Sequence, residues 1–467
     1  MMALAAQALK KDKVAMFRDR AHTIADRWVD SLASALLNDK PLTMEEISAL
    51  FEAKKTELMG ALVTDFIGVH HQEVLEQESA ACPKCGKPCK AKRQASRRVD
   101  SRHGSSLLAR PYFHCRDCGV GFSALDQTLQ LSGRRKQYDL QRLALDYVAE
   151  MPFARAAELL AKSTGVSFSE HTLHDFLADF TVGLTLEDVI PAAEEITKRI
   201  AEVQGKSKRR PVLVVATDGA HLPTRPKPGR SGKRGKGEFK EAKGFRLYPL
   251  GSGNRIVQLA SWHQIQDADQ CARALKTVAQ RIAADEVRIA LVGDGASWLW
   301  RAMTEAFPTG REVLDYYHCS EHVHALAPVV YPDAPLKALQ WTEATMARLF
   351  YGEVTKVIGG LKRMRPKKDA VKEAIRKLIG YLENNAHRID YARNRNGGYA
   401  IGSGGIESAN KFICHVRLKR SGAWWLKENG NGMLALRCAL ANGTLDAAFK
   451  NYVARDQQKG TALETNA

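Results

Sequence analysis

Two aspartates occupy the same short motif, each at the end of an apolar run. Asp218 follows Val212-Leu-Val-Val-Ala-Thr, Asp294 follows Val287–Gly293, and Gly-Ala comes directly after both. If these runs are neighbouring strands of one sheet, their ends bring the two carboxylates together. Glu407, which follows a glycine-rich turn and opens the last amphipathic helix, supplies a third. Three carboxylates can hold two Mg²⁺ (or Mn²⁺) ions about 4 Å apart, an arrangement suited to phosphodiester chemistry.

Other interpretations of these acidic residues remain open. An aspartate followed by glycine at a strand end is often only a turn residue. Asp315 ends the next strand, is followed by Tyr-Tyr-His, and competes with Asp294 as the second ligand. His318 could orient a scissile phosphate, although such histidines are more often structural. The repeated motif together with Glu407 favours catalysis by Asp218, Asp294 and Glu407.

Five of the nine cysteines lie between positions 82 and 118. Cys82 and Cys85 form one CxxC knuckle and Cys115 and Cys118 a second, each followed by glycine, which is the pattern of a zinc ribbon. We expect these four to bind one structural Zn²⁺, with Cys89 and His114 as bystanders. The zinc then either only stabilises a small module or also presents basic residues to DNA. The candidate DNA contacts in this module are Lys87, Arg97 and Arg98.

Two further basic segments flank the acidic residues. Residues 225–246 hold nine basic and two acidic residues among several glycines, which predicts a flexible loop that closes on DNA. The candidate contacts in this loop are Arg230, Lys233, Arg234 and Lys236. The final helix adds Lys411, Arg417, Lys419 and Arg420. The pair Trp424-Trp425 follows, and these rings either stack on an unpaired base or belong to the core, the latter being favoured.

The rest of the chain must position these groups. Residues 1–80 have helical periodicity, with a capping box at Thr43 and Glu46. Residues 130–200 read as helix, glycine turn and helix, which is typical of helix-turn-helix DNA binding and equally of a plain helical bundle. His171 and Thr172 are the candidate groove-facing residues.

Residues 210–318 alternate strands and helices in an order that predicts an α/β, ribonuclease-H-like core. Three antiparallel strands come first and parallel strands follow, with a helical insertion before the last helix. The expected organisation has seven parts. They are a helical region (1–80), a zinc ribbon (81–125), a helix-turn-helix region (130–200), the first part of the core (208–318), the insertion (319–400), the last part of the core (401–455) and a disordered tail (456–467).

Composition agrees with this organisation. The 467 residues carry 70 Lys and Arg against 52 Asp and Glu, a net charge of +18, which favours a polyanionic partner such as nucleic acid. No run of apolar residues is long enough for a transmembrane helix, and the clustered cysteines indicate metal binding in a reducing compartment. We expect a cytoplasmic protein near the bacterial nucleoid.

The sequence resembles the DDE transposases of bacterial insertion sequences, most of all the Kra-type group and its mutator-like relatives. The phrases that carry the resemblance are VVATDGAHLPTR, LVGDGASWLWRAMTEAFP, VLDYYHCSEHV and GSGGIESANKFICHVRLKRSGAWW. The resemblance implies a catalytic triad at Asp218, Asp294 and Glu407. It further implies metal-dependent cutting of terminal inverted repeats, strand transfer by the freed 3′-hydroxyl, and a homodimer or larger assembly on double-stranded DNA.

Two other functions fit the same residues. One is a domesticated regulator that binds DNA but has lost catalysis. The other is a structure-specific nuclease or junction resolvase on the same core, which would need no end-specific binding.

Overall fold

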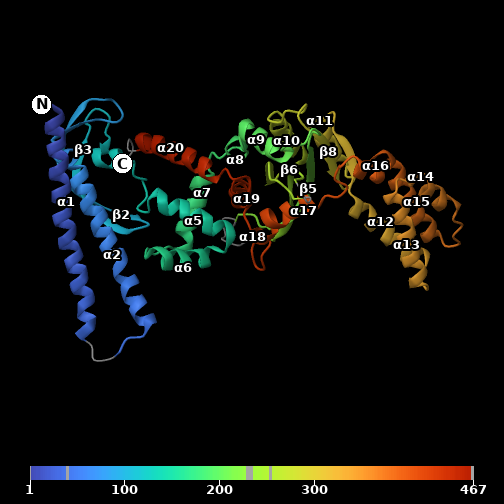
Figure 1. The fold of residues 1–467 in the computed structure, drawn as a ribbon, viewed down its shortest axis with the longest axis horizontal. Coiled ribbons are helices and arrows are strands. Elements are labelled where there is room, and N and C mark those ends of the chain that lie inside the picture. The colour runs from blue at the N-terminus through green and yellow to red at the C-terminus, as the bar shows by residue number, and fades with distance from the viewer. Residues whose placement is uncertain (1, 38–40, 228–234, 252–254, 464–467) are drawn as a thin grey trace. The chain divides into compact units, whose positions relative to one another are not determined.

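The computed structural model describes residues 2–37, 41–227, 235–251 and 255–463 (Figure 1). The chain divides into two compact units. The first comprises Met1–Phe180 with Phe449–Ala467, and the second comprises Thr181–Ala448. Both sheets and helices are present, so the protein is of mixed α/β type. The seven domain ranges expected from the sequence stay predictions.

The first unit opens with two long helices that lie side by side, α1 (Met2–Ala33) and α2 (Met44–His70) (Figure 1). Edge-to-face ring contacts join them, Phe17 to Phe66 at 5.3 Å and Trp28 to Phe51 at 5.8 Å between centroids. The predicted capping box at the start of α2 is present, since Thr43 and Glu46 bond each other's backbone N–H groups. Local sequence therefore fixes where this helix begins.

An antiparallel sheet follows, with strand order β1-β2-β3-β4. Its strands are β1 (Ser79–Ala81), β2 (Pro88–Ser101), β3 (Gly104–His114) and β4 (Gly121–Phe122). Gly104 adopts φ +104° at the β2–β3 turn, a conformation that glycine accepts without strain. A small core holds the sheet end together and consists of Cys82, Cys89, Phe113, Cys115, Val120 and Phe122.

Helices complete the first unit: α3 (Gln72–Leu75), α4 (Ala124–Thr128), α5 (Tyr138–Glu150), α6 (Phe153–Thr164), α7 (Glu170–Thr181) and the end of α20 (Leu445–Leu463). Gly165 ends α6 in the left-handed conformation, φ +67°, at the predicted glycine turn. Phe449 and Tyr452 of α20 contact the rings of Phe180 and Tyr138. The predicted order of helix, glycine turn and helix is present in α6, Gly165 and α7.

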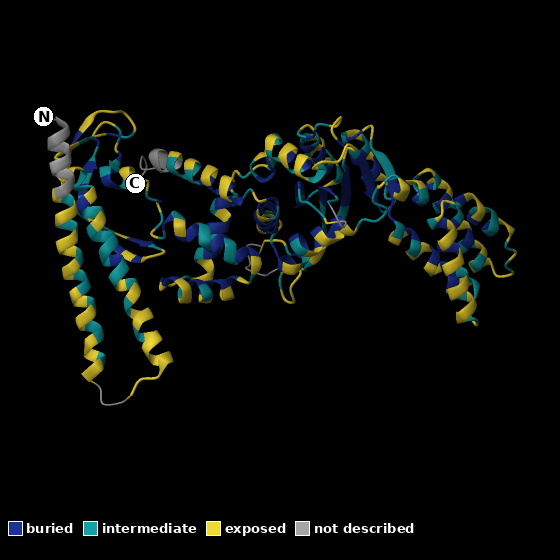
Figure 2. Ribbon diagram, viewed as in Figure 1, coloured by how far each residue is buried: buried dark blue, intermediate teal, exposed yellow. Residues whose placement is uncertain are grey.

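The second unit is built on a five-stranded sheet of order β7-β6-β5-β8-β9. Its strands are β5 (Val212–Thr224), β6 (Glu238–Pro249), β7 (Ala260–Ile265), β8 (Arg288–Gly293) and β9 (Arg311–Leu314). β6 runs antiparallel to its two neighbours β5 and β7, whereas β8 and β9 run parallel to β5. Residues Val212–Thr217 of β5 and all but the first residue of β8 are buried (Figure 2), as expected for central strands.

Helices α8 (Leu186–Val189) and α9 (Ala193–Gln204) precede the sheet, and α10 (Ala268–Ala279) and α11 (Ser297–Ala306) connect its strands. A helical segment then runs through α12 (Tyr316–Val330), α13 (Pro335–Phe350), α14 (Val354–Arg363), α15 (Asp369–Asn384) and α16 (Tyr391–Asn396). The chain returns to the sheet with α17 (Gly404–Ala409), a π-helical turn (Asn410–His415), α18 (Val416–Leu418) and α19 (Lys427–Asn442).

Two element boundaries differ from expectation. β5 does not end at Asp218 but continues to Thr224, because β6 pairs with it along that whole length. β6 begins at Glu238, so the second half of the predicted 225–246 loop is strand. Within the described residues, no helix combines the length and apolar character needed to cross a membrane.

Candidate functional site

Asp218 lies where two neighbours of β5 part. The parallel pairing of β5 with β8 ends at Ala216 and Val292, while the antiparallel pairing with β6 continues past Asp218, which is opposite Gly244. Asp294 is the first residue after β8. The predicted neighbouring of the two strands is therefore confirmed, and both aspartates lie at the same edge of the sheet.

The Asp218 carboxylate has defined partners on both oxygens. Oδ1 accepts from its neighbour Gly219 N at 2.7 Å, and Oδ2 accepts from Asn410 Nδ2 at 2.6 Å. Burial raises the pKa of Asp218 to about 6, and the charges of Asp294 and Glu407 push it the same way. Asp218 therefore lies close enough to the other two predicted carboxylates to be influenced by their charges.

Asp294 is held at the start of the loop that leads into α11. Its Oδ1 accepts from Ala296 N at 2.9 Å, and its Oδ2 lies 4.0 Å from Nε2 of His318. The intervening Gly295 has φ +107°, which a side chain would strain. The side chain of Asp294 keeps 34% of its surface exposed, so it is open to a ligand.

Glu407 projects from α17 and is exposed, with its Oε1 accepting from Ser403 Oγ at 2.7 Å. α17 approaches β6 closely because of Gly405. A Cβ at Gly405 would lie 2.2 Å from the ring of Tyr248, and Arg246 Nη1 donates to the Gly405 carbonyl at 2.7 Å. The glycine before the glutamate therefore sets the position of the helix.

The three carboxylates are not gathered about one point. Among the described residues, the group whose ligand atoms all lie within 4.8 Å of one another is a set of four cysteines, and the acidic residues do not form such a group. The donor set of Asp218, Asp294 and Glu407 is nonetheless all oxygen, which suits Mg²⁺ or Mn²⁺ rather than a softer metal.

Asp315, the alternative second ligand, has a structural role. It is 1% exposed and caps α12, with Oδ1 accepting from His318 N at 2.9 Å and Oδ2 from Ser403 N at 2.5 Å. Because both oxygens are bonded to backbone N–H groups, Asp315 is corrected to a helix cap that ties α12 to the Glu407 segment. His318 is half exposed and lies 3.6 Å from Glu321 as well as close to Asp294.

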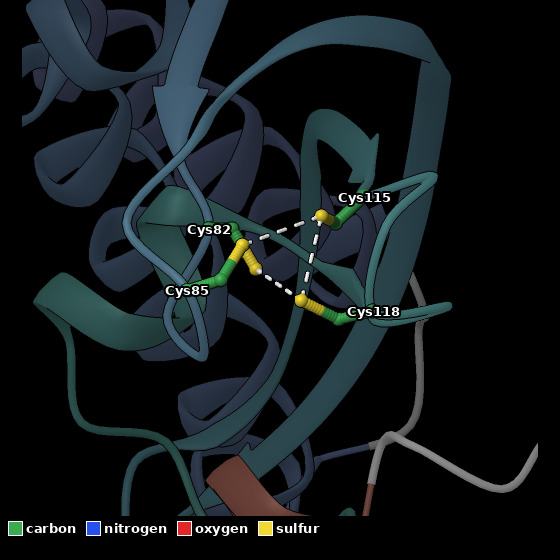
Figure 3. Close-up of side chains that lie close together, drawn as sticks. All are labelled: Cys82, Cys85, Cys115 and Cys118. Atoms are coloured by element: carbon green, nitrogen blue, oxygen red, sulfur yellow. Dashed lines mark hydrogen bonds between the residues drawn. The ribbon is translucent and has the colours of Figure 1, made fainter.

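The four predicted cysteine ligands are brought together in the first unit (Figure 3). Sγ–Sγ distances are 3.9 Å for Cys82–Cys118, 3.7 Å for Cys85–Cys115 and 3.7 Å for Cys115–Cys118. Zinc–sulfur bonds of about 2.3 Å in a tetrahedron place sulfurs about 3.8 Å apart. The four cysteines could therefore hold a metal such as zinc with little movement.

The two knuckles have the same backbone geometry. Gly86 N donates to Cys82 O and Gly119 N to Cys115 O, each at 2.9 Å, and both glycines have positive φ near 70°. Hydrogen bonds from the backbone of Cys118 and Asp117 lower the pKa of Cys115 to about 6, which favours the thiolate. Cys89 is buried in the same small core but does not belong to the group of four ligands, and its thiol donates to Lys87 O.

A family model matches residues 45–453. The chain belongs to the uncharacterised protein family UPF0236. No curated protein matches it in a sequence comparison. Among solved structures it is similar to a chain of the Drosophila P element transposase strand transfer complex, at 12% identity over 68% of this chain and 81% of that chain. The TM-score is 0.26, which is too low to carry a structural argument.

The predicted DNA contacts of the first unit separate into two groups in this UPF0236 chain. Lys87, Arg98 and His171 are exposed. Arg97 is instead held by Asp126 at 2.8 Å and by Ser132 O, so its guanidinium is engaged within the unit. Thr172 belongs to the start of α7, where its N–H donates to Ser169 Oγ at 3.1 Å.

In the second unit, Lys236, Lys411, Lys419 and Arg420 are exposed, whereas Arg230, Lys233 and Arg234 lie outside the described residues. The prediction that Arg417 contacts DNA requires correction. It is 3% exposed and its guanidinium lies 5.1 Å from the ring centre of Trp425, so it does not face solvent. Trp425 is core, as favoured from the sequence, but Trp424 is 40% exposed.

Asn410 is the residue that sequence reasoning missed. It is 4% exposed, begins the π-helical turn and bonds Asp218. Its spacing of three residues from Glu407 places it on a neighbouring position of the same helical surface. The three-residue spacing from a predicted ligand was the signal in the sequence that could have found Asn410. The π-helical turn that begins there is a feature frequent at functional sites.

Proposed function

We propose that this protein is a metal-dependent DNA strand transferase of the transposase type, acting at Asp218, Asp294 and Glu407. The observation that carries the proposal is the placement of three carboxylates: Asp218 on β5, Asp294 directly after the parallel neighbour β8, and Glu407 on α17, whose following turn bonds Asp218 through Asn410. Like charges held close together repel one another, and a bound cation relieves that repulsion. Such a site is therefore a candidate for cation binding.

The arrangement of the second unit supports a ribonuclease-H-like core. Three antiparallel strands are followed by two strands parallel to the first, and the acidic residues come from the central strand, its parallel neighbour and a late helix. The helical segment α12–α16 lies between the second and third carboxylates in sequence, as an insertion would.

The residues present fit divalent metal. Two bound Mg²⁺ or Mn²⁺ ions would activate a water or 3′-hydroxyl and stabilise the leaving oxygen. Asn410 fixes one oxygen of Asp218, and the Ala296 N–H fixes one oxygen of Asp294, so each carboxylate offers its remaining lone pairs in a set direction. His318, within 4.0 Å of Asp294, would contact a phosphate oxygen of DNA bound at the carboxylates.

Binding to DNA is supported by charge. The net charge of +18 and the exposed side chains Lys236, Lys411, Lys419 and Arg420 favour a phosphate backbone in the unit that carries the carboxylates. A zinc ion in the four-cysteine site would stabilise a second basic module. Because two DNA ends must be joined, the active form is a homodimer or a larger assembly on DNA, acting at the nucleoid in the cytoplasm.

Cleavage of DNA that flanks the coding sequence tests the proposal. Wild-type protein with Mg²⁺ or Mn²⁺ should nick and join a duplex that carries the element's ends, and Asp294→Ala should do neither. Unrelated duplex and branched DNA are the controls. A folded, DNA-bound wild type that leaves the end-containing duplex intact rejects a transferase, and cutting of branched DNA alone indicates a junction nuclease.

A regulator that binds DNA without cutting it is the second candidate. One observation favours it: the acidic ligand atoms do not form a compact group, and Asn410 and Ser403 engage Asp218 and Glu407. Its signature is binding that needs the cysteine site but is the same with and without Mg²⁺. Metal-dependent nicking by the wild type excludes it.

A further inference from the structure

Trp424 and Phe239 form an exposed aromatic pair in the second unit. Phe239 on β6 is 58% exposed and Trp424 is 40% exposed, and their ring centroids are 6.1 Å apart. The Arg225 guanidinium lies 5.0 Å from the Trp424 ring centre. Two large exposed rings side by side leave apolar surface in contact with water, and a bound partner would remove that surface from water. The cation over one ring would in addition attract an anionic partner. We call Arg225, Phe239 and Trp424 the aromatic surface.

The aromatic surface is held rigidly on β5. Trp425, next to Trp424, forms a β-bridge with Thr224, in which Trp425 N donates to Pro223 O at 3.1 Å and Arg225 N donates to Trp425 O at 2.8 Å. Trp425 itself is buried and its Nε1 donates to Leu418 O at 3.0 Å. The two tryptophans therefore have different roles: Trp425 anchors the segment, and Trp424 presents its ring.

Gly237 makes room for that ring. A Cβ at Gly237 would come within 2.2 Å of the Trp424 six-membered ring. The glycine thus lets the strand leading into β6 lie flat against the indole. Lys236, directly before it, is exposed, and so is Lys227, which follows the end of β5. Cations therefore flank the rings in sequence on both strands.

We propose that the aromatic surface binds an unpaired nucleobase of a single-stranded DNA segment. Aromatic rings stack on any base, and neighbouring cations attract its phosphates, which is the combination that single-strand binders use. Double-stranded DNA does not offer its base faces, so the pair should discriminate between the two forms. The cations Arg225 and Lys236, and Lys227 although it lies 3.9 Å from Glu428, disfavour a basic protein partner and a second copy of this +18 chain.

The surface lies on the same strand as Asp218. Thr224 lies six positions after Asp218, which is about 20 Å along an extended strand. A strand opened near the carboxylates could therefore stack its freed base here. This placement in the reaction depends on the proposed function, whereas single-strand binding itself does not.

The test measures fluorescence anisotropy of a labelled 15-nucleotide thymidine oligomer and of a labelled duplex of equal length. Trp424→Ala and Phe239→Ala should each weaken single-strand binding about fivefold or more, as loss of base stacking predicts, with duplex binding changed less than about twofold. Trp424→Phe, which keeps a ring, should restore most of the affinity. Trp341→Ala, a partly buried tryptophan of α13, is the matched control and should leave both affinities unchanged.

Unchanged oligomer binding by folded Trp424→Ala overturns the proposal. If Trp424→Ala instead loses self-association while its affinity for the oligomer is unchanged, the surface is a contact between copies of the chain, and the proposal is also overturned. The cleavage assay separates this outcome from the proposed function. Wild type that binds the oligomer through Trp424 but never cuts DNA rejects only the transferase. If the wild type cuts DNA and Trp424→Ala binds the oligomer normally, only the proposed single-strand binding by the aromatic surface is rejected.

Discussion

The side-chain amide of Asn410 donates a 2.6 Å hydrogen bond to Oδ2 of Asp218. Asn410 belongs to the π-helical turn that directly follows the Glu407 helix, so this bond ties the third carboxylate's element to the first carboxylate. A hydrogen bond to a charged acceptor is stronger than one between neutral groups. Asn410 therefore orients Asp218 and offsets part of the repulsion from Asp294 and Glu407.

Removing that amide should weaken metal binding. We expect Asn410→Ala to raise the dissociation constant for Mn²⁺ about tenfold to a hundredfold, the usual effect of losing a residue that orients a ligand. Free Mn²⁺ can be counted by electron paramagnetic resonance in a titration without DNA. Asp218→Asn gives the level of binding that comes from other sites.

The control for this substitution is Asn442→Ala. Asn442 is 1% exposed and donates to Val189 O and Ser261 O, away from the carboxylates. It should lower the unfolding temperature as much as Asn410→Ala does while leaving Mn²⁺ affinity at the wild-type value. Equal Mn²⁺ affinity in Asn410→Ala and wild type would show that Asn410 only supports the fold.

Substitutions at Asp294 and Asp315 should affect different properties, DNA cleavage for Asp294 and stability for Asp315. Asp294→Ala should abolish metal-dependent cleavage but keep DNA affinity equal or tighter, since a repelling charge is removed. Asp315→Asn should lower the free energy of unfolding by about 1–2 kcal/mol, because it weakens the α12 cap and the hydrogen bond from Ser403 N. Cleavage and unfolding measured on both variants separate the roles, and cleavage retained by Asp294→Ala would contradict the assignment of the second ligand.

Much of the second unit could be predicted from its sequence, because buried strands such as Val212–Thr217 are continuous apolar runs. The continuation of β5 through Gly219 to Thr224 could not, since those residues have turn-like composition and are strand only through pairing with β6. The glycines of 225–246 suggested flexibility. In the structure Gly237 faces Trp424 and Gly244 faces His263, so each is required by a ring from a distant segment.

The predicted site divides along the same line. Cysteine spacing is a local signal, and all four predicted ligands meet. The carboxylates were found from local motifs, but Asn410 joins Asp218 across 192 residues of sequence. Arg417 shows the limit of charge patterns: a basic residue in a basic helix packs on Trp425 in the core.

The cysteine site should bind one zinc ion per chain. We expect Cys115→Ser to lose the zinc measured by elemental analysis and to loosen β1–β4, whose small core includes three cysteines. Cys89→Ser is the matched control, because Cys89 is buried in the same core but its thiol bonds Lys87 O instead. Wild-type protein purified without chelator and free of zinc would remove the site, and zinc loss in Cys89→Ser would add Cys89 to the ligands.

His263 should make the second unit sensitive to acid. The residue is fully buried on β7, its ring lies over Gly244, and among the described residues neither ring nitrogen has a hydrogen-bond partner of good geometry. Burial lowers the pKa of His263 to about 3; the nearby Asn410 side chain opposes this shift and the Arg246 charge adds to it. An unfolded histidine has a pKa of about 6.5, so the unfolded state binds the extra proton between these values and stability falls as the pH falls through that window.

The loss from this group alone should be about 2 kcal/mol between pH 7 and pH 5. Calorimetric unfolding of the full chain at both pH values measures it. His263→Gln, which cannot take up a proton, should lose clearly less stability over that interval than the wild type, whatever its stability at pH 7. His221→Gln on β5, where the histidine is exposed, should keep the wild-type difference. The same pH dependence in wild type and His263→Gln would mean that His263 is not the acid-sensitive group.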